Sequence, residues 1–213
     1  MNISYAIPVC NEHIELKLLL LFLLQKIDEN DEIVIQCDQG NTTPEVYKTL
    51  DTCKKLQPEG KNQINIIEYP LKGHFSNFKN NLKEHCTGDW IFQIDADEYP
   101  HESLIQNLKE LLKLNTNTEM LMVPRVNTVD GLTQEHINKW RWNVNEKGWV
   151  NWPDYQTRII QNSPKIRWQN KVHEQIVGVS TKGALPIEEE WCLYHPKTIG
   201  RQEAQNNYYD TLI

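Results

Sequence analysis

Strand-like and helix-like segments alternate along the first 126 residues, and this alternation limits the folds open to the chain more than any other feature. Three apolar strand patterns are each followed by a helix pattern, in the order 3–9 and 12–26, 32–37 and 44–56, and 63–69 and 75–85. A fourth strand pattern ends at Asp95, and after it come a periodic helix from Leu104 to Leu112 and a strand at 120–126. Strands separated by helices of this length form parallel sheets with right-handed crossovers. We therefore predict an α/β fold with a mostly parallel central sheet flanked by helices.

The strand that ends at Asp95 runs directly into a cluster of carboxylates. Residues Trp90 to Ile94 are nearly all apolar, as in a strand covered on both faces, and Asp97 and Glu98 follow Asp95 closely. In open parallel sheets, ligands bind beyond the carboxyl ends of the strands. Carboxylates at that edge suit Mg²⁺ or Mn²⁺, although an Asp-x-Asp triplet taken alone fits a solvated turn equally well.

The pattern changes after Asn127. Four tryptophans crowd into 13 residues, at Trp140, Trp142, Trp149 and Trp152. Short strand patterns follow at 157–161, 171–177 and 187–193, and an amphipathic helix carrying Ile199, Tyr208 and Leu212 is expected to close the chain. A length of 213 residues suits one domain, so we divide it into a half at 1–126 and a smaller half at 127–213 that packs on the first.

Composition argues against several classes of protein. The net charge of -7 and the pI near 5.5 give no basic stripe for a nucleic acid, so no nucleic-acid partner is expected. Five scattered cysteines without Cys-x-x-Cys spacing predict neither a disulfide framework nor a zinc ribbon, and favour a reducing cytoplasm. The first strand has no basic leader before it, and the longest apolar run, 18–24, is too short to span a bilayer. We therefore expect neither export nor a transmembrane segment.

Glycine-based phosphate sites are missing from the sequence. It contains neither Gly-x-Gly-x-x-Gly after the first strand nor the P-loop pattern. Carboxylates that bind Mn²⁺ or Mg²⁺ are the remaining means of holding phosphates, and Asp97 with its neighbours offers the oxygen ligands that these ions prefer.

Three stretches taken together resemble family 2 glycosyltransferases of the GT-A fold. They are YAIPVCNE at 5–12, FKNNLKEHCTGDWIFQIDADE at 78–98, and TRIIQNSPKIRWQNKVHEQI at 157–176 followed by LYH at 193–195. Their order and separations are similar to those of the family, and the resemblance spans about 3–195. It implies a metal-dependent enzyme that moves a sugar from a nucleoside-diphosphate sugar, commonly a UDP-sugar, to a glycan or other hydroxyl acceptor with inversion.

The resemblance also implies roles for individual residues. Asp95 is expected at the ribose and beside the metal, Asp97 on the metal, and His195 as a further metal ligand. Residues implied to bind the nucleotide-sugar are Pro8, Asn11, Glu12, Asp38, Lys79, Asp95 and Arg158, and to these we add Ala96, His173 and Trp152. The four tryptophans suit a sugar ring or a core equally well, and Trp152 is favoured for the cleft because it adjoins Asp154. A structural role is the alternative for three of these: Lys79 as an exposed helix lysine, Arg158 as a brace for the loop before Glu174, and Trp152 as a core residue.

The transfer needs a carboxylate that takes the proton of the acceptor hydroxyl. We favour Glu174, which lies in the second half beside His173, and its structural alternative is a salt bridge to Lys171 or Arg167. Asp154 is the second candidate, although an acid after proline is also a common turn residue.

Two other functions remain open from the sequence. A metal-dependent nucleotidyltransferase would also place carboxylates at strand ends, but its Gly-rich and basic first loop is missing after Val9. A non-catalytic sugar- or nucleotide-binding module of the same fold is the other alternative.

Overall fold

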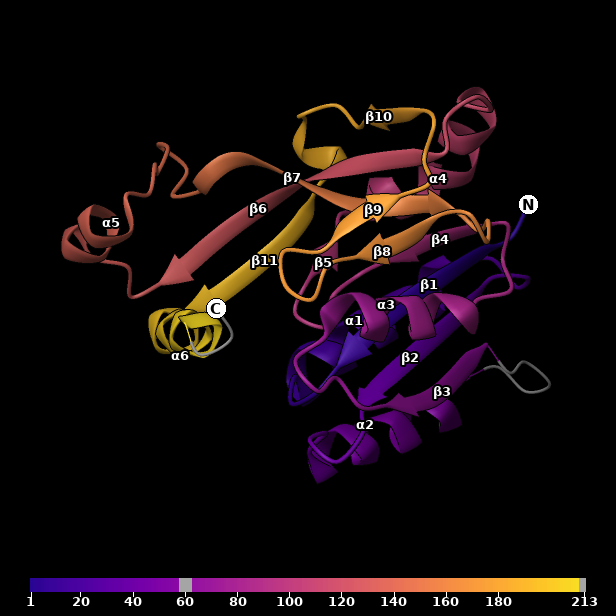
Figure 1. The fold of residues 1–213 in the computed structure, drawn as a ribbon, viewed down its shortest axis with the longest axis horizontal. Coiled ribbons are helices and arrows are strands. Elements are labelled where there is room, and N and C mark those ends of the chain that lie inside the picture. The colour runs from indigo at the N-terminus through magenta and orange to yellow at the C-terminus, as the bar shows by residue number, and fades with distance from the viewer. Residues whose placement is uncertain (58–62, 211–213) are drawn as a thin grey trace.

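Within residues 1–57 and 63–210, which the structure describes, one nine-stranded sheet forms the centre of the protein (Figure 1). The structure is a computed structural model. The strands of this sheet are β1 (Ile3–Val9), β2 (Glu32–Asp38), β3 (Ile64–Tyr69), β4 (Trp90–Gln93), β5 (Tyr99–Pro100), β6 (Met120–Asp130), β7 (Val150–Gln161), β10 (Lys182–Ala184) and β11 (Leu193–Thr198). A separate pair consists of β8 (Arg167–Gln169) and β9 (Gln175–Val177). The helices are α1 (His13–Lys26), α2 (Pro44–Lys55), α3 (Phe75–Glu84), α4 (Glu102–Leu114), α5 (Gln134–Trp140) and α6 (Ile199–Asp210).

The sheet follows the order β3-β2-β1-β4-β7-β6-β11-β5, with β10 also paired to β6. Most pairs are parallel, while β7 runs antiparallel to both β4 and β6, and β5 runs antiparallel to β11. The strands β1, β2, β4, β6 and β11 therefore all end at the same edge. This arrangement confirms the predicted α/β class and the mostly parallel sheet.

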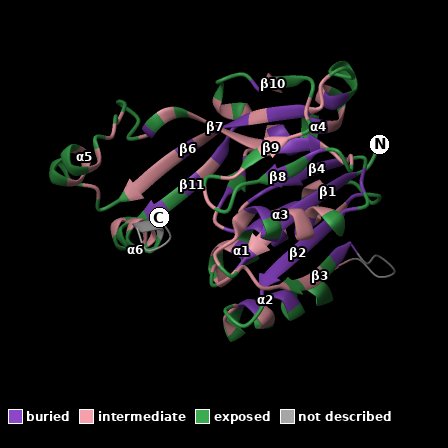
Figure 2. Ribbon diagram, viewed as in Figure 1, coloured by how far each residue is buried: buried purple, intermediate pink, exposed green. Residues whose placement is uncertain are grey.

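Helices cover both faces of the part of the sheet that consists of β3, β2, β1 and β4. Tyr5 and Ile7 of β1 belong to one core cluster with residues of α1, α2 and α4, while Ala6 points to a second cluster with Leu82 of α3 and Ile160 of β7. Figure 2 shows β1, β2 and β4 almost wholly buried. Neighbouring residues of one strand are thus buried on opposite faces, which is why these strands are continuous apolar runs in the sequence.

The long strands β6 and β7 carry the chain away from this core (Figure 1). Their outer ends, with α5 and the loop that joins α5 to β7, form an extension that we call the arm (residues 127–152). None of the residues of α5 is buried, and a capping box between Thr133 and His136 stabilises its first turn. The division after residue 126 falls within β6, and β6, β7 and β11 of the second half lie in the same sheet as the first half.

The predicted strands and helices of the first half are confirmed to within two residues at most boundaries. The strand expected to end at Asp95 ends at Gln93, because β4 pairs with β1 only that far and the chain then turns, with the Glu98 amide donating to the Asp95 carbonyl at 2.8 Å. The strand expected at 120–126 is longer and reaches Asp130. The arm helix α5 was not predicted.

The second half differs more from expectation. The strand at 157–161 is the end of the longer β7, and of 171–177 only Gln175–Val177 is strand, since Asn170 and His173 adopt positive φ angles. The strand expected at 187–193 is wrong: Glu189–Trp191 forms a 3-10 turn and β11 begins at Leu193. The closing helix is present as α6, while Leu212 lies outside the described residues.

Two expectations from composition can be compared with the structure. All five cysteines are free thiols. Of the helices formed by residues 1–57 and 63–210, none has the length and apolar character needed to cross a membrane.

Candidate active site

A cleft of about 1020 Å³ opens along the edge where the parallel strands end. All the site residues predicted from the sequence line it except Trp152. Near the sheet its walls are charged, with the side chains of Asp38, Lys79, Asp95, Asp97, Arg158 and His195, which we call the inner end. Between the arm and α6 the lining is mainly amide, hydroxyl and aromatic, with Thr128, Trp142, Asn151, Gln202, Gln205 and Asn206, which we call the outer end.

Strand order explains how distant residues reach the inner end. Pro8 lies near the end of β1, Asp38 ends β2, Asp95 and Asp97 follow β4, and His195 lies in β11. Because these strands run in the same direction, their ends meet at one edge of the sheet.

Two of the predicted nucleoside-binding acids also organise the loops that carry them. The Glu12 carboxylate accepts the backbone amides of Cys10 and Asn11 at 2.9 and 3.0 Å, which folds it back onto the β1–α1 loop. Asp38 is buried and accepts the Leu71 amide at 2.9 Å and the Asn41 side chain at 3.0 Å. Each acid therefore fixes the shape of the cleft wall.

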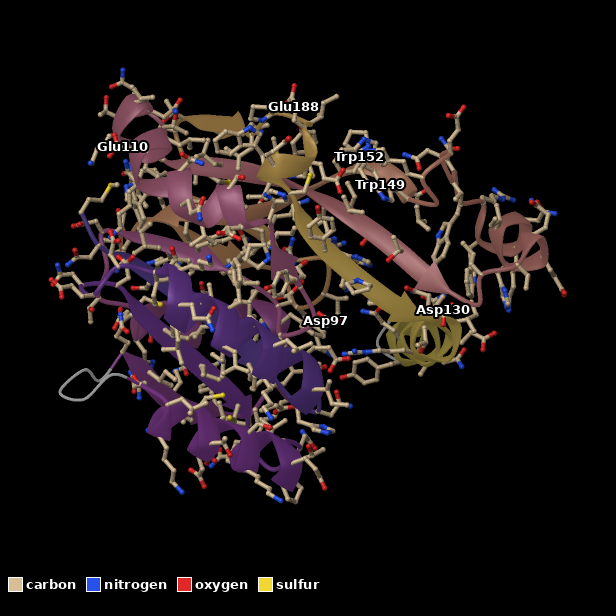
Figure 3. All side chains as sticks on the ribbon, turned by 180° about the vertical axis from the view of Figure 1, so that it is seen from behind. Asp97, Glu110, Asp130, Trp149, Trp152 and Glu188 are labelled. Carbon is tan, nitrogen blue, oxygen red and sulfur yellow. The ribbon has the colours of Figure 1, made fainter. Side chains whose placement is uncertain are left out.

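Asp97 and His195 meet at the inner end, near the point labelled Asp97 in Figure 3. The distance from His195 Nε2 to Asp97 Oδ2 is 3.2 Å, and Arg201 Nη2 lies 3.5 Å from the same oxygen. Burial raises the pKa of Asp97, but the hydrogen bond and charge of His195, with Lys197 and Arg201 nearby, outweigh it and leave the pKa below its usual range. Asp97 is thus a carboxylate with cations around it.

Asp95 is bound to Arg158, whose side chain is buried. Arg158 Nη2 donates to Asp95 Oδ2 at 2.6 Å and to Glu98 Oε1 at 2.5 Å. Glu98 in turn accepts from Arg125 Nη1 at 2.9 Å. Burial raises the pKa of Asp95, yet Arg158, followed by Lys79, brings it below its usual value. Arg158 therefore braces the turn after β4, rather than the loop before Glu174 that its structural alternative proposed, and it also lines the cleft.

Asp154 is surrounded by donors. Its Oδ2 accepts from Arg125 Nε and Nη2 at 2.9 and 2.7 Å and from Asn127 Nδ2 at 2.8 Å, and its Oδ1 accepts from Gln156 at 2.6 Å. Burial raises the pKa of Asp154, but Arg125 and the hydrogen bonds of Asn127 and Gln156 lower it overall. Because both of its oxygens already accept hydrogen bonds and its pKa is lowered, Asp154 is a poor acceptor of a further proton.

Glu174 forms an ion pair with Lys79 of α3, and the ammonium also lies 4.4 Å from the centre of the Trp168 ring. The partner of Glu174 is thus neither Lys171 nor Arg167, the two residues considered from the sequence. His173, with a positive φ of 53°, lies beside Glu174 on the cleft wall. Lys79 is mostly buried rather than an exposed helix lysine.

Trp142, rather than Trp152, is the tryptophan that lines the cleft. Trp152 packs edge-on against Trp149, with ring centres 4.8 Å apart, and Figure 3 shows these two rings together and well away from Asp97. Trp142 packs on Trp140 with ring centres 4.6 Å apart.

The residues at the inner end fit a divalent cation with few protein ligands. Among the described residues, no three His, Cys, Asp or Glu side chains gather as a complete metal shell. The 3.2 Å between Asp97 Oδ2 and His195 Nε2 nonetheless matches the roughly 3 Å between adjacent octahedral ligands with bonds of about 2.1 Å. Asp95, also predicted as a metal ligand, is held by Arg158 instead. Such a site suits a divalent cation whose remaining ligands are water molecules and phosphate oxygens of the substrate.

Comparison with known proteins identifies the family. The sequence profile of glycosyl transferase family 2 matches residues 4–174, most of the chain. The chain belongs to glycosyl transferase family 2. This agrees with the resemblance seen in the sequence and favours glycosyl transfer over nucleotidyl transfer. A search of curated protein sequences gave no match to this family 2 chain.

Solved structures share the fold of this family 2 chain. TarS 1-349 from S. aureus superposes with a TM-score of 0.61 at 12% identity, covering 92% of this chain and 60% of that one. TarS 1-349 in complex with UDP gives 0.62, also at 12% identity with coverages of 92% and 60%. With UDP-GlcNAc the TM-score is 0.60 at 12% identity, covering 92% and 59%. The family 2 chain thus spans three fifths of the TarS fragment, and at this identity the likeness concerns the fold.

Among the cleft residues of the family 2 chain that sequence analysis missed are Arg125, Asn127, Lys197 and Arg201. Arg125 and Asn127 lie in β6, where a strand pattern gave no sign that they would face Asp154 across the sheet. Arg201 lies in α6 and reaches Glu12 and Glu15 of the first helix region, at 3.3 and 2.7 Å. Only the pairing of distant strands and helices brings them into the site.

Proposed function

We propose that this protein transfers a sugar from a nucleoside-diphosphate sugar to an acceptor hydroxyl, with inversion and with the help of Mn²⁺ or Mg²⁺. The observation that carries the proposal is the pairing of Asp97 with His195 at the strand ends of a family 2 chain. A cation bound there would stabilise negative charge on the departing diphosphate. Asp97 and His195 are the residues that would hold it.

A uridine nucleotide is the donor that the comparisons favour. TarS, whose fold this chain shares, has been crystallised with UDP and with UDP-GlcNAc. In this chain the nucleoside would lie against Pro8, Asn11 and Asp38 at the ends of β1 and β2, and its phosphates would then point toward Asp97 in the same cleft.

Basic side chains at the inner end would bind the diphosphate directly. Lys197 is buried near Asp97 and is held by Gln205 at 2.5 Å, and burial lowers its pKa although Asp97 opposes the shift. Arg201 and Lys79 also line this part of the cleft. These groups supply local positive charge within a chain whose net charge is -7.

Glu174 is the residue we assign as the general base. It lines the cleft with one hydrogen-bonded partner among the described residues, Lys79, whereas both oxygens of Asp154 are occupied by four donor groups. A phosphate of the donor can take over the Lys79 ammonium, which leaves the Glu174 carboxylate able to accept the hydroxyl proton. The acceptor would then enter from the outer end, where amides and Trp142 suit a neutral carbohydrate.

A binding screen tests the donor and the cation together. UDP, UDP-GlcNAc, GDP and ADP are each added with Mn²⁺ and with EDTA, and the melting temperature is followed. At a ligand concentration of about 100 Kd the native state gains roughly 2.7 kcal/mol, so a rise of about 5–10 °C is expected for uridine nucleotides with Mn²⁺. Equal melting temperatures with and without Mn²⁺ for every nucleotide would contradict the proposal. Release of UDP and the anomeric configuration of the product, read by NMR, then test transfer and inversion.

A further inference from the structure

A hydrogen-bonded chain of side chains crosses three neighbouring strands and ends at His195. It begins at Asp154 in β7, passes through Asn127 in β6 and reaches His195 in β11. Asn127 Nδ2 lies 2.8 Å from Asp154 Oδ2, and Asn127 Oδ1 lies 2.8 Å from His195 Nδ1. The register of the sheet sets His195 directly beside Asn127, so the backbone already holds the two side chains together.

The chemistry of this chain of contacts fixes the direction of each hydrogen bond. An ionised carboxylate only accepts hydrogen bonds, so the Asn127 group that faces Asp154 must be its NH₂. The carbonyl oxygen of Asn127 then faces His195, and Nδ1 of the ring must carry the proton that it receives. The remaining ring nitrogen, Nε2, is the atom turned toward Asp97.

Asp154 is itself held in place from behind. Arg125 donates two hydrogen bonds to it and one to the buried Glu98, which also binds Arg158. With its position fixed by Arg125, Asp154 sets the orientation of the Asn127 amide rather than following it.

We propose that Asn127 and Asp154 are positioning residues that hold the His195 ring with its Nδ1 proton on Asn127 and its Nε2 directed, beside Asp97, at a divalent cation. The inference rests on the proposed function because it requires the cation to bind between Asp97 and His195. It assigns Asp154 a different role from that of a general base. Histidines that bind metals commonly donate their other N–H to a carboxylate or carbonyl oxygen, which fixes the ring and its tautomer.

Metal affinity provides the first test. Binding of Mn²⁺ in the presence of UDP is measured by EPR for the unaltered protein and for Asn127→Leu, which keeps the size of the side chain but removes both hydrogen bonds. A loss of about 10–100-fold in Mn²⁺ affinity is expected. Asn138→Leu is the matched control, because Asn138 is exposed on α5 and its side chain bonds only to Gln134 among the described residues. Its Mn²⁺ affinity should equal that of the unaltered protein.

The ring nitrogens of His195 provide a second test, with a readout that a purely structural role would not affect. Two-dimensional ¹⁵N spectra distinguish an imidazole protonated on Nδ1 from one protonated on Nε2, and the His195 signals are assigned by their loss in His195→Gln. With UDP and the diamagnetic ion Mg²⁺, which would occupy Nε2, the unaltered protein should show the Nδ1–H form, and Asn127→Leu should show a larger fraction protonated on Nε2.

Asp154→Asn separates positioning from base catalysis. If Asp154 positions His195, this variant binds Mn²⁺ more weakly and regains most of its kcat at high Mn²⁺ concentration. Mn²⁺ affinity that is lost in His195→Ala but unchanged in Asn127→Leu and Asp154→Asn would overturn the inference and leave the proposed function intact. Failure of the unaltered protein to bind Mn²⁺ would instead overturn the proposed function, and the inference with it.

Discussion

The two ends of the cleft differ in chemistry and in how the fold builds them. The inner end lies where β1, β2 and β4 of the buried sheet finish beside His195 of β11, and its side chains are charged and paired, as in Asp97 with His195 and Asp95 with Arg158. The outer end lies between the arm and α6, where Figure 2 shows mostly half-buried and exposed residues. Its side chains are mainly amides and an indole. Charged side chains with little exposure to solvent suit a diphosphate and its cation. Amide side chains and an aromatic ring suit a neutral sugar.

The largest expected effect comes from Glu174, the residue assigned to accept the proton of the acceptor hydroxyl, which is paired with Lys79 of the inner end. Glu174→Gln should lower kcat by about 10²–10⁴-fold, because the amide cannot take the acceptor proton, while the thermal shift with UDP and Mn²⁺ stays within about a degree of the unaltered protein. Steady-state release of UDP measures kcat. Glu110→Gln on α4, which is exposed and far from the cleft, is the control. A Glu174→Gln enzyme with normal turnover would rule out Glu174 as the base.

Buried charge at the inner end should also govern stability. Arg158→Met leaves Asp95 and the fully buried Glu98 without their shared cation, so the free energy of unfolding should fall by about 3–5 kcal/mol, measured by urea denaturation at pH 7. Lys113→Met, at an exposed helix pair, should change it by less than about 0.5 kcal/mol.

The pH dependence of this loss follows from the lowered pKa of Asp95. A carboxylate whose pKa is lower in the folded than in the unfolded protein stabilises the fold above the unfolded value of about 3.9, and that stabilisation disappears as the pH falls through the folded value. The difference between Arg158→Met and the unaltered protein should therefore shrink from pH 7 toward pH 3. A difference that stays constant over this range would show that lost packing, not lost charge pairing, accounts for the effect.

The same contrast explains how far the sequence predicted the molecule. The inner end could be located because strand ends in a parallel sheet share an edge, which put Asp95 and Asp97 there, while Asp38 and His195 were assigned to it through the resemblance to family 2 glycosyltransferases. The pairing of β7 between β4 and β6 could not, since it joins residues far apart in the sequence, such as Trp90 with Gln161, through a register that no local pattern records. The places of Arg125 and Asn127 in the cleft, and the hydrogen bonds that they donate to Asp154, all depend on that register.

The tryptophans show the limit of local reasoning most directly. All four were recognised as a cluster, and Trp152 was favoured for the cleft because it adjoins Asp154 in sequence. Two positions apart in a regular strand, Trp152 and Asp154 would share one face, but the register of β7 with β6 shifts between Asp154 and Val150, so Asp154 lines the cleft while Trp152 packs against Trp149. Trp142 is further from Asp154 in sequence but reaches the cleft through the loop that follows α5.

The smallest expected effect tests the outer end and uses this pair of tryptophans. Trp142→Ala should raise KM for a sugar acceptor about fivefold, which corresponds to about 1 kcal/mol for one lost aromatic contact. The acceptor is the most active member of a panel of monosaccharide glycosides, and KM for the donor should stay unchanged because the inner end is intact. Trp152→Ala removes a ring of the same size from the arm without touching the cleft, so it should leave KM for the acceptor unaltered. Equal increases in the two variants would mean that the arm acts through its overall packing, whereas an increase confined to Trp142→Ala would locate the acceptor sugar against that ring.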